Sequence, residues 1–181
     1  EASPWLSDFI CQSPKLKKLT ISGNVENLAA IVAAVNQHAL LERLEVQPNS
    51  GRVYQQLGEI VLHSSSLRTL TIDCRGPDAL QQLEINAHLI QEALQFNETM
   101  TEVHIYTNRL GQPYEFQTSL VEVVSAAVCD NSSLDGIRSS NHTVQSISHC
   151  VAQSTGSHQY PSNRYAKFFR INKNFAQFLE N

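Results

Sequence analysis

Side chains that could carry out acid–base chemistry lie two residues apart at His104 and Tyr106. On an extended strand this spacing places both side chains on the same face. No recognised motif supplies them with a carboxylate partner. The chain also contains no nucleophile elbow, no phosphate-binding loop and no His-Glu-x-x-His sequence. We therefore expect the protein not to be an enzyme and assign no catalytic residue.

The best candidates for metal ligands are His142, His149, Cys150 and His158, because imidazole and thiolate groups suit a zinc ion. Their spacing matches no zinc finger, and none of the four cysteines forms a Cys-x-x-Cys pair. Such scattered histidine and cysteine residues are most simply explained as incidental rather than as a metal site. We assign no metal ligand and expect no cofactor.

The cysteines and the glycosylation sequons point to different compartments. Cys11 and Cys129 fall on the faces of expected helices, where a free thiol commonly serves as a small buried apolar group. This favours a reducing intracellular compartment. Asn-x-Ser/Thr sequons at Asn97, Asn131 and Asn141 point the other way. Each precedes an expected strand, where asparagine suits the turn, and their use as glycan sites stays open.

Composition excludes two classes of partner. The chain has 181 residues and a net charge of −4, whereas a dedicated nucleic-acid binder normally carries a basic excess. Its longest uninterrupted aliphatic run, Leu28 to Val35, is too short to cross a bilayer. We expect no nucleic-acid binding and no integral membrane segment.

The elements that must position these side chains come from a repeat. The pattern Leu16-x-x-Leu19-x-Ile21 returns from Leu41, from Leu67 and from Met100, and a weaker copy begins at Val144. The first three intervals are 25, 26 and 33 residues (41 − 16, 67 − 41 and 100 − 67). Self-similarity at such a period is typical of repeat proteins built from one strand and one helix per repeat.

The pattern predicts strands over 16–22, 41–47, 67–73, 100–106 and 143–149, with apolar residues at helical spacing between them. Such repeats stack parallel strands into a curved sheet and pack their helices on its convex side. We therefore predict an α/β solenoid of about five repeats over residues 1–151, with an incomplete N-terminal repeat. Residues 152–163 read as a polar loop. Residues 164–181 read as a capping helix, and the alternative for that helix is a basic amphipathic docking or membrane-surface helix.

Over Leu16 to Ile147 the chain resembles leucine-rich-repeat proteins of the ribonuclease-inhibitor-like kind, with Asn97 and Asn131 in the turn where such repeats often carry asparagine. The closing stretch, from Cys129-Asp130-Asn131 to Arg170-Ile171-Asn172-Lys173, is similar to that of uncharacterised repeat proteins predicted from microalgae. The usual asparagine after the last apolar strand residue is replaced by Gly23-Asn24, Pro48-Asn49 and Cys74. Ribonuclease inhibition is therefore not implied.

Residues between the apolar positions of each strand should face outward on the concave side, in three rows. The rows are Lys18, Arg43, Thr69, Glu102 and Ser146; Thr20, Glu45, Thr71, His104 and Ser148; and Ser22, Gln47, Asp73, Tyr106 and Cys150. Arginine and tyrosine commonly anchor protein interfaces. The predicted partner-binding residues are Lys18, Thr20, Arg43, Glu45, Gln47, Asp73, Glu102, His104 and Tyr106, with Arg43 and Tyr106 as anchors.

The expected function is a non-catalytic module that binds a protein partner through its concave face. The alternative is a structural or assembly subunit of a larger multisubunit complex, docked through the convex helices or the ends of the array. The two differ in what they require: only the first needs the concave residues for binding.

Overall fold

The computed structural model describes residues 4–25, 28–74, 79–108, 143–144, 146–152 and 169–170. Helices and strands alternate along the chain in the order that the repeat predicts. They are α1 (Pro4–Gln12), β1 (Lys18–Val25), α2 (Ala29–Gln37), β2 (Arg43–Pro48), α3 (Gly51–His63), β3 (Thr69–Cys74), α4 (Ala79–Phe96), β4 (Glu102–Asn108), β5 (Ser146–Ala152) and β6 (Phe169–Arg170).

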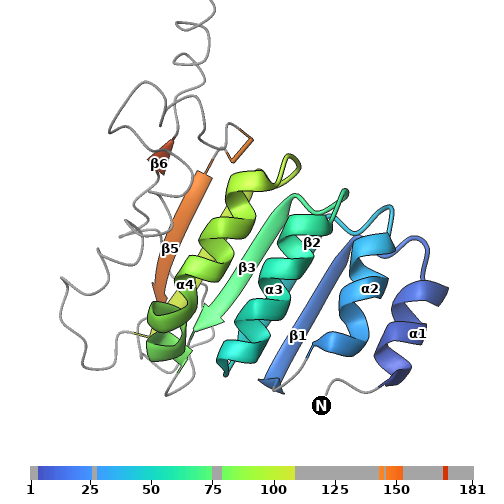
Figure 1. Ribbon diagram of the computed structural model, residues 1–181, viewed down its shortest axis with the longest axis horizontal. Helices are drawn as coiled ribbons and strands as arrows, with labels where there is room; N and C mark the ends of the chain where they lie inside the picture. The colour runs from blue at the N-terminus through green and yellow to red at the C-terminus, as the bar shows by residue number, and fades with distance from the viewer. Residues whose placement is uncertain are drawn as a thin grey trace, which may run out of the picture.

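The strands form one open sheet in the order β1-β2-β3-β4-β5-β6. β1 to β5 pair in parallel with their sequence neighbours, and β6 pairs antiparallel to β5. Figure 1 shows α1 to α4 side by side along one face of this sheet. The predicted α/β architecture with parallel strands and alternating helices is confirmed at this level.

The core lies between the helices and the sheet, and the repeated apolar positions build it. Leu41, Leu67 and Met100, the first residues of their motifs, are fully buried. The remaining motif positions of β2, β3 and β4 are no more than 1% exposed: Leu44, Val46, Leu70, Ile72, Val103 and Ile105. Burying such side chains contributes about 1.5–3 kcal/mol each before entropy is counted, so this layer is the main source of cohesion.

Helices α3 and α4 approach each other closely at Gly58. A Cβ atom added at Gly58 would lie 3.1 Å from the carbonyl oxygen of Leu89 in α4. Because the neighbouring atom belongs to the backbone, it cannot move aside as a flexible side chain could. Glycine at this position therefore sets the distance between the two helices.

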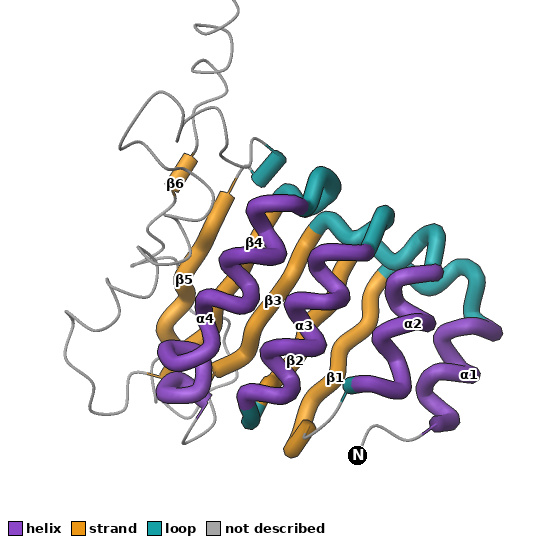
Figure 2. The backbone as a smooth tube through the Cα atoms, in the orientation of Figure 1, coloured by secondary structure: helices purple, strands orange, loops and turns teal. Residues whose placement is uncertain are grey.

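Each helix is joined to the next strand by a turn of the same length. The connections 13–17, 38–42, 64–68 and 97–101 each contain five residues. Figure 2 shows these turns lined up along one edge of the molecule. The strand-to-helix connections differ, with three residues at 26–28, two at 49–50 and four at 75–78.

Polar side chains tie each of these turns to the one before it. His38 Nε2 donates to the carbonyl of Ser13 at 2.9 Å, and Nδ1 accepts from the Leu40 N–H at 3.2 Å. Ser66 Oγ lies 2.6 Å from the carbonyl oxygen of His38 and 3.0 Å from that of Leu41. These bonds pair backbone groups that would otherwise be buried without partners. We call the series the turn ladder.

The ladder continues into the third and fourth repeats. Thr99 Oγ1 lies 3.1 Å from the carbonyl oxygen of Ser64 and 2.9 Å from that of Leu67, in positions that match those of Ser66 one repeat earlier. Thr143 Oγ1 reaches the Asn97 carbonyl at 3.3 Å. A hydroxyl just before the first apolar residue of a motif therefore repeats the same bond from turn to turn.

Asn97 is the first residue of the turn 97–101, and only 4% of its surface is exposed. Its amide nitrogen donates to the Val61 carbonyl at 2.5 Å. Its oxygen accepts from the backbone N–H groups of Thr99 at 2.9 Å and Met100 at 2.6 Å. The turn-forming role predicted for this sequon residue is confirmed. Asn131 and Asn141 lie outside the described residues.

The structure differs from the sequence predictions at Cys11 and in the expected capping helix. Cys11 is exposed, although a buried thiol was expected, whereas Cys74 is buried. Within the expected capping helix 164–181 the structure describes only Phe169–Arg170, which form the short strand β6. This strand pairs with Ser146 and Ile147 at the start of β5, whereas a helix could not pair with a strand edge. Of the expected polar loop 152–163, Ala152 ends β5, and residues 153–163 lie outside the described residues, as does Cys129.

Replacing Asn97 should lower the free energy of unfolding more than replacing an exposed turn residue does. Asn97→Ala leaves the Val61 carbonyl and two backbone N–H groups without their partner, which should lower the free energy of unfolding by about 2–3 kcal/mol. Ser65→Ala, at an exposed position of the preceding turn, should change it by less than about 0.5 kcal/mol. Urea denaturation measures both. Equal stability of the two variants would contradict the structural role of Asn97.

A larger side chain at Gly58 should separate α3 from α4. Gly58→Leu is expected to lower the free energy of unfolding by about 1–3 kcal/mol, since it places side-chain atoms against the α4 backbone. Gln81→Leu adds a leucine at an exposed position of α4 and serves as the control. A Gly58 variant as stable as this control would show that the helices can move apart freely.

Candidate functional site

The sheet surface opposite the helices carries the predicted rows of polar side chains, and we call it the open sheet face. Along β2 each buried residue alternates with an exposed or half-buried one, so the rows point away from the core. The strand registers align the first row throughout: Lys18, Arg43, Thr69, Glu102 and Ser146. They also align the second: Thr20, Glu45, Thr71, His104 and Ser148.

The third row is aligned only in part. Asp73, Tyr106 and Cys150 are register partners across β3, β4 and β5. Between β1 and β2 the register shifts after Ile21. The shift coincides with Gly23-Asn24, and a glycine inside a strand often marks such a bulge. Ser22 and Gln47 are therefore not shown as partners of this row.

Carboxylates on the open sheet face are held by neighbouring strands. Glu45 Oε2 lies 3.0 Å from Lys18 Nζ and accepts from Thr20 Oγ1 at 3.2 Å. Glu102 Oε2 lies 3.4 Å from Thr69 Oγ1 and 3.3 Å from His104 Nε2. Half-exposed pairs of this kind contribute little to stability, but they fix the directions of the side chains.

Arg43 differs from these residues, because its side chain is exposed and its guanidinium makes no recorded contact within the described ranges. Its register partners are Lys18 and Thr69, neither of which is acidic. Tyr106, the second predicted anchor, is half-buried on β4. Among the described residues of the open sheet face, Arg43 is therefore an accessible cation without an ion pair, beside pairs that are already satisfied.

The contact between His104 and Glu102 was missed at the sequence level, although both residues were placed on the same surface. Their spacing of two on a strand was the available signal, because residues i and i+2 share a face. A histidine beside a carboxylate can accept and release protons, yet that alone defines no reaction. We assign the pair no catalytic role.

Asp73 does not behave as an outward-facing residue, because only 8% of its surface is exposed. Its register partner on β4 is Tyr106, and the buried Cys74 follows it on β3. Of the other predicted partner-binding residues, Lys18, Thr20 and Arg43 are exposed, and Glu45, Gln47, Glu102, His104 and Tyr106 are half-buried.

Within the part of the chain that the structure describes, no three metal-binding side chains cluster. His149 and Cys150 belong to β5, and His142 and His158 lie outside the described residues. None of the described helices is long and apolar enough to cross a bilayer.

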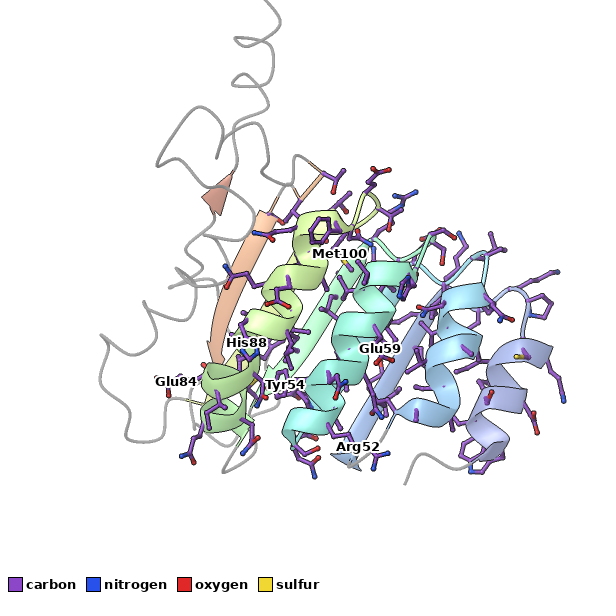
Figure 3. All side chains as sticks on the ribbon, viewed as in Figure 1. Arg52, Tyr54, Glu59, Glu84, His88 and Met100 are labelled. Carbon is purple, nitrogen blue, oxygen red and sulfur yellow. The ribbon has the colours of Figure 1, made fainter. Side chains whose placement is uncertain are left out.

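A groove of about 660 Å³ lies on the other side of the molecule, between α2 and α3. Its apolar floor includes Val32 and Ala33, and Arg52 and Glu59 stand along α3 (Figure 3). The side-chain oxygen of Asn36, which also lines the groove, is buried and makes no hydrogen bond to any described residue. The groove is a second surface that could receive a partner.

Tyr54 and Cys74 form a buried contact between α3 and β3, with 3.6 Å between the hydroxyl oxygen and the sulfur. Burial raises the pKa of Cys74 from 9.0 to about 12; the hydrogen bond with Tyr54 lowers this pKa, and the charge of Asp73 raises it. Burial also raises the pKa of Tyr54 well above its ordinary value. Both groups stay protonated, so the contact is structural and offers no activated nucleophile.

No protein-family model matches the chain, and no curated protein matches it either. Among solved structures, one titled Leiomodin-1 Actin-Binding Site 2 is similar, with a TM-score of 0.51 and 11% sequence identity. The match covers 81% of this chain and 76% of that chain. At this identity the likeness supports the α/β fold alone.

The buried Tyr54–Cys74 contact should make the protein sensitive to alkali. Because the folded state holds the Cys74 proton up to about pH 12 and the unfolded chain releases it near pH 9, stability should be complete below pH 9 and fall above it. For one thiol the loss approaches about 1.4 kcal/mol per pH unit. Urea denaturation from pH 8 to pH 11 tests this. A Cys74→Ala variant should show a shallower decline, and an unchanged slope would contradict the assignment.

Proposed function

We propose that this protein is a non-catalytic interaction module of the leucine-rich-repeat kind, which binds a protein partner through its open sheet face. The observation that carries the proposal is that all described helices lie on one side of a parallel sheet (Figure 1). Parallel sheets are ordinarily covered on both faces. A repeat array that covers one face leaves the other available for binding.

The chemistry of this face suggests how the partner would be recognised. Glu45 and Glu102 already have partners within the face, whereas Arg43 projects a positive charge that is free to pair. An arginine that reaches a partner's carboxylate can form two parallel hydrogen bonds. We therefore expect the partner to place an acidic side chain over Arg43 and a flatter, mixed surface over Tyr106.

The similar structure supplies a first partner to try. Its title describes an actin-binding site, and the similarity to this chain lies in the fold alone. Actin is thus a reasonable first candidate in a binding assay. A negative result with actin would leave other protein partners of the open sheet face to be tested.

A second candidate function is a structural subunit that docks through its helices. Two features favour it: the groove between α2 and α3, and the large apolar side chains exposed on α4, where Ile85 is 57% and Phe96 is 73% exposed. This alternative places the contact on the surface opposite Arg43, so the two functions can be separated by substitution.

Two exposed arginines on opposite surfaces provide a matched test. Arg43 lies on the open sheet face, and Arg52 lines the helix groove. The unchanged full chain and its two variants, Arg43→Glu and Arg52→Glu, are immobilised separately. Proteins from the native source that bind to each are quantified by mass spectrometry. We expect the specific partner to be reduced at least about tenfold by Arg43→Glu, because repulsion replaces a charge-assisted hydrogen bond.

Arg52→Glu should recover the partner as well as the unchanged chain does. A calorimetric titration of the purified partner with each variant then confirms that the contact is direct. Loss of the partner with Arg52→Glu but not with Arg43→Glu would reject the open sheet face and support docking through the helices.

A further inference from the structure

The sequon Asn97-Glu98-Thr99 opens the turn between α4 and β4, and its acceptor atom faces the interior. Asparagine in such a sequence receives an N-linked glycan on Nδ2, and a residue that carries one lies at the surface. Asn97 is only 4% exposed. Its Nδ2 donates to the carbonyl of Val61 at 2.5 Å and lies 3.5 Å from that of Ser64. The amide nitrogen is therefore directed at α3 and the turn that follows it.

The surroundings of this nitrogen leave no room for a sugar. Val61 is fully buried, and Ser64 is 4% exposed. A sugar ring bonded to Nδ2 would have to take the place of one of the two carbonyl groups that Nδ2 now faces. Both belong to the backbone, and a protein interior is packed too densely to take in such a group without displacing an element. A glycan at Asn97 and the packed turn therefore exclude each other.

The hydroxyl group of the sequon is engaged as well. A serine or threonine two residues after the asparagine is part of what defines the acceptor sequence. Thr99 is half-buried, and its Oγ1 lies 2.9 Å from the carbonyl oxygen of Leu67 and 3.1 Å from that of Ser64. The backbone N–H groups of Thr99 and Met100 both donate to Asn97 Oδ1. A transferase would have to break these contacts to bind the sequon in the folded chain.

The contacts that cover the sequon join parts of the chain that lie far apart in the sequence. Val61 and Ser64 lie 36 and 33 residues from Asn97, and Leu67 lies 32 residues from Thr99. Such contacts form only when the third repeat packs against the fourth, so the sequon is accessible in the unfolded chain. Folding and glycan attachment thus compete for the same amide group.

We propose that Asn97 is a glycan acceptor only in the unfolded chain, and that a glycan attached there prevents α4 and its turn from packing against α3. In this step an oligosaccharyl transferase breaks the bond between the anomeric carbon of a sugar and the oxygen of a lipid diphosphate. A bond from that carbon to Nδ2 forms, the amide gives up one proton, and the lipid diphosphate leaves.

Two consequences follow for the protein. Folded molecules carry no sugar at Asn97, and a compartment that contains the transferase and its donor divides the chains into folded and modified ones. The proposal concerns a buried turn, so it does not depend on which surface binds a partner.

The first experiment measures access to the sequon. Purified transferase and its lipid-linked oligosaccharide donor are incubated with the folded full chain or with a synthetic peptide of residues 92–104, which contains the same sequon. Mass spectrometry follows the glycan at Asn97. We expect the peptide to be modified and the folded chain to react at least about tenfold more slowly, because only its small unfolded fraction offers the sequon. Equal rates would overturn the proposal, and so would a peptide that remains unmodified.

The second experiment asks whether the glycan prevents folding. The full chain is translated behind a secretory signal into microsomes with limiting donor, so that modified and unmodified chains coexist. Limited proteolysis then separates the folded, resistant molecules, and glycan occupancy is measured at each sequon before and after. Occupancy at Asn97 should fall at least about tenfold in the resistant fraction, since unfolded chains are cleaved.

A matched control places a sequon beside the preceding turn. His63→Asn creates one with Ser65, and both positions are exposed, at and just beyond the end of α3. Its glycan should persist in the resistant fraction, because it points to solvent. Unchanged occupancy at Asn97 would overturn the proposal. An equal fall at both sites would also overturn it, because any glycan would then disrupt the fold. The peptide comparison needs no substitution and decides the access claim if the control variant does not fold.

Discussion

The hydrogen bonds of the turn ladder are the constraint on which the remaining structure depends. The turn after each helix brings backbone carbonyls into a buried layer, where an unpaired group costs about 1–3 kcal/mol. His38, Ser66, Thr99 and Thr143 supply partners from the next repeat. Each bond joins a turn to the turn before it, and Ser66 and Thr99 make the same pair of contacts one repeat apart, next to the start of the following strand. The aligned registers of β1 to β5 follow from the same spacing.

Register, in turn, gives the open sheet face its organisation. A slip of one residue would send the polar rows into the core and the leucines into solvent. With the register fixed, Glu45 meets Lys18 across the strands and Glu102 meets Thr69, so a surface of mixed charge becomes ordered. Stability and recognition thus depend on different faces of the same strands. The apolar residues pack the sheet against the helices, and the alternating polar residues form a surface that contributes little to stability.

The repeating features could be predicted from the sequence, because they arise from spacing alone. Leu-x-x-Leu-x-Ile identified the buried positions, and counting outward from it placed Arg43 beside Thr69 and His104 beside Thr71. Features that depend on local geometry could not be predicted. The shift after Ile21 separates Ser22 from its expected row, and Asp73 is shielded by its surroundings. The exposure of Cys11 depends on which side of α1 meets α2, and a short helix with apolar residues on several sides leaves that undecided.

The constant five-residue turns bear on how such a chain can change during evolution. Helices grow from nine residues in α2 to thirteen in α3 and eighteen in α4, yet the turn that follows each of them keeps its length. The differences in length among the repeats therefore fall in the helices and in the strand-to-helix connections, at the end remote from the ladder. Those connections, 26–28, 49–50 and 75–78, are the positions at which new loops could be grafted and selected, while the opposite edge admits substitution but not a change of length.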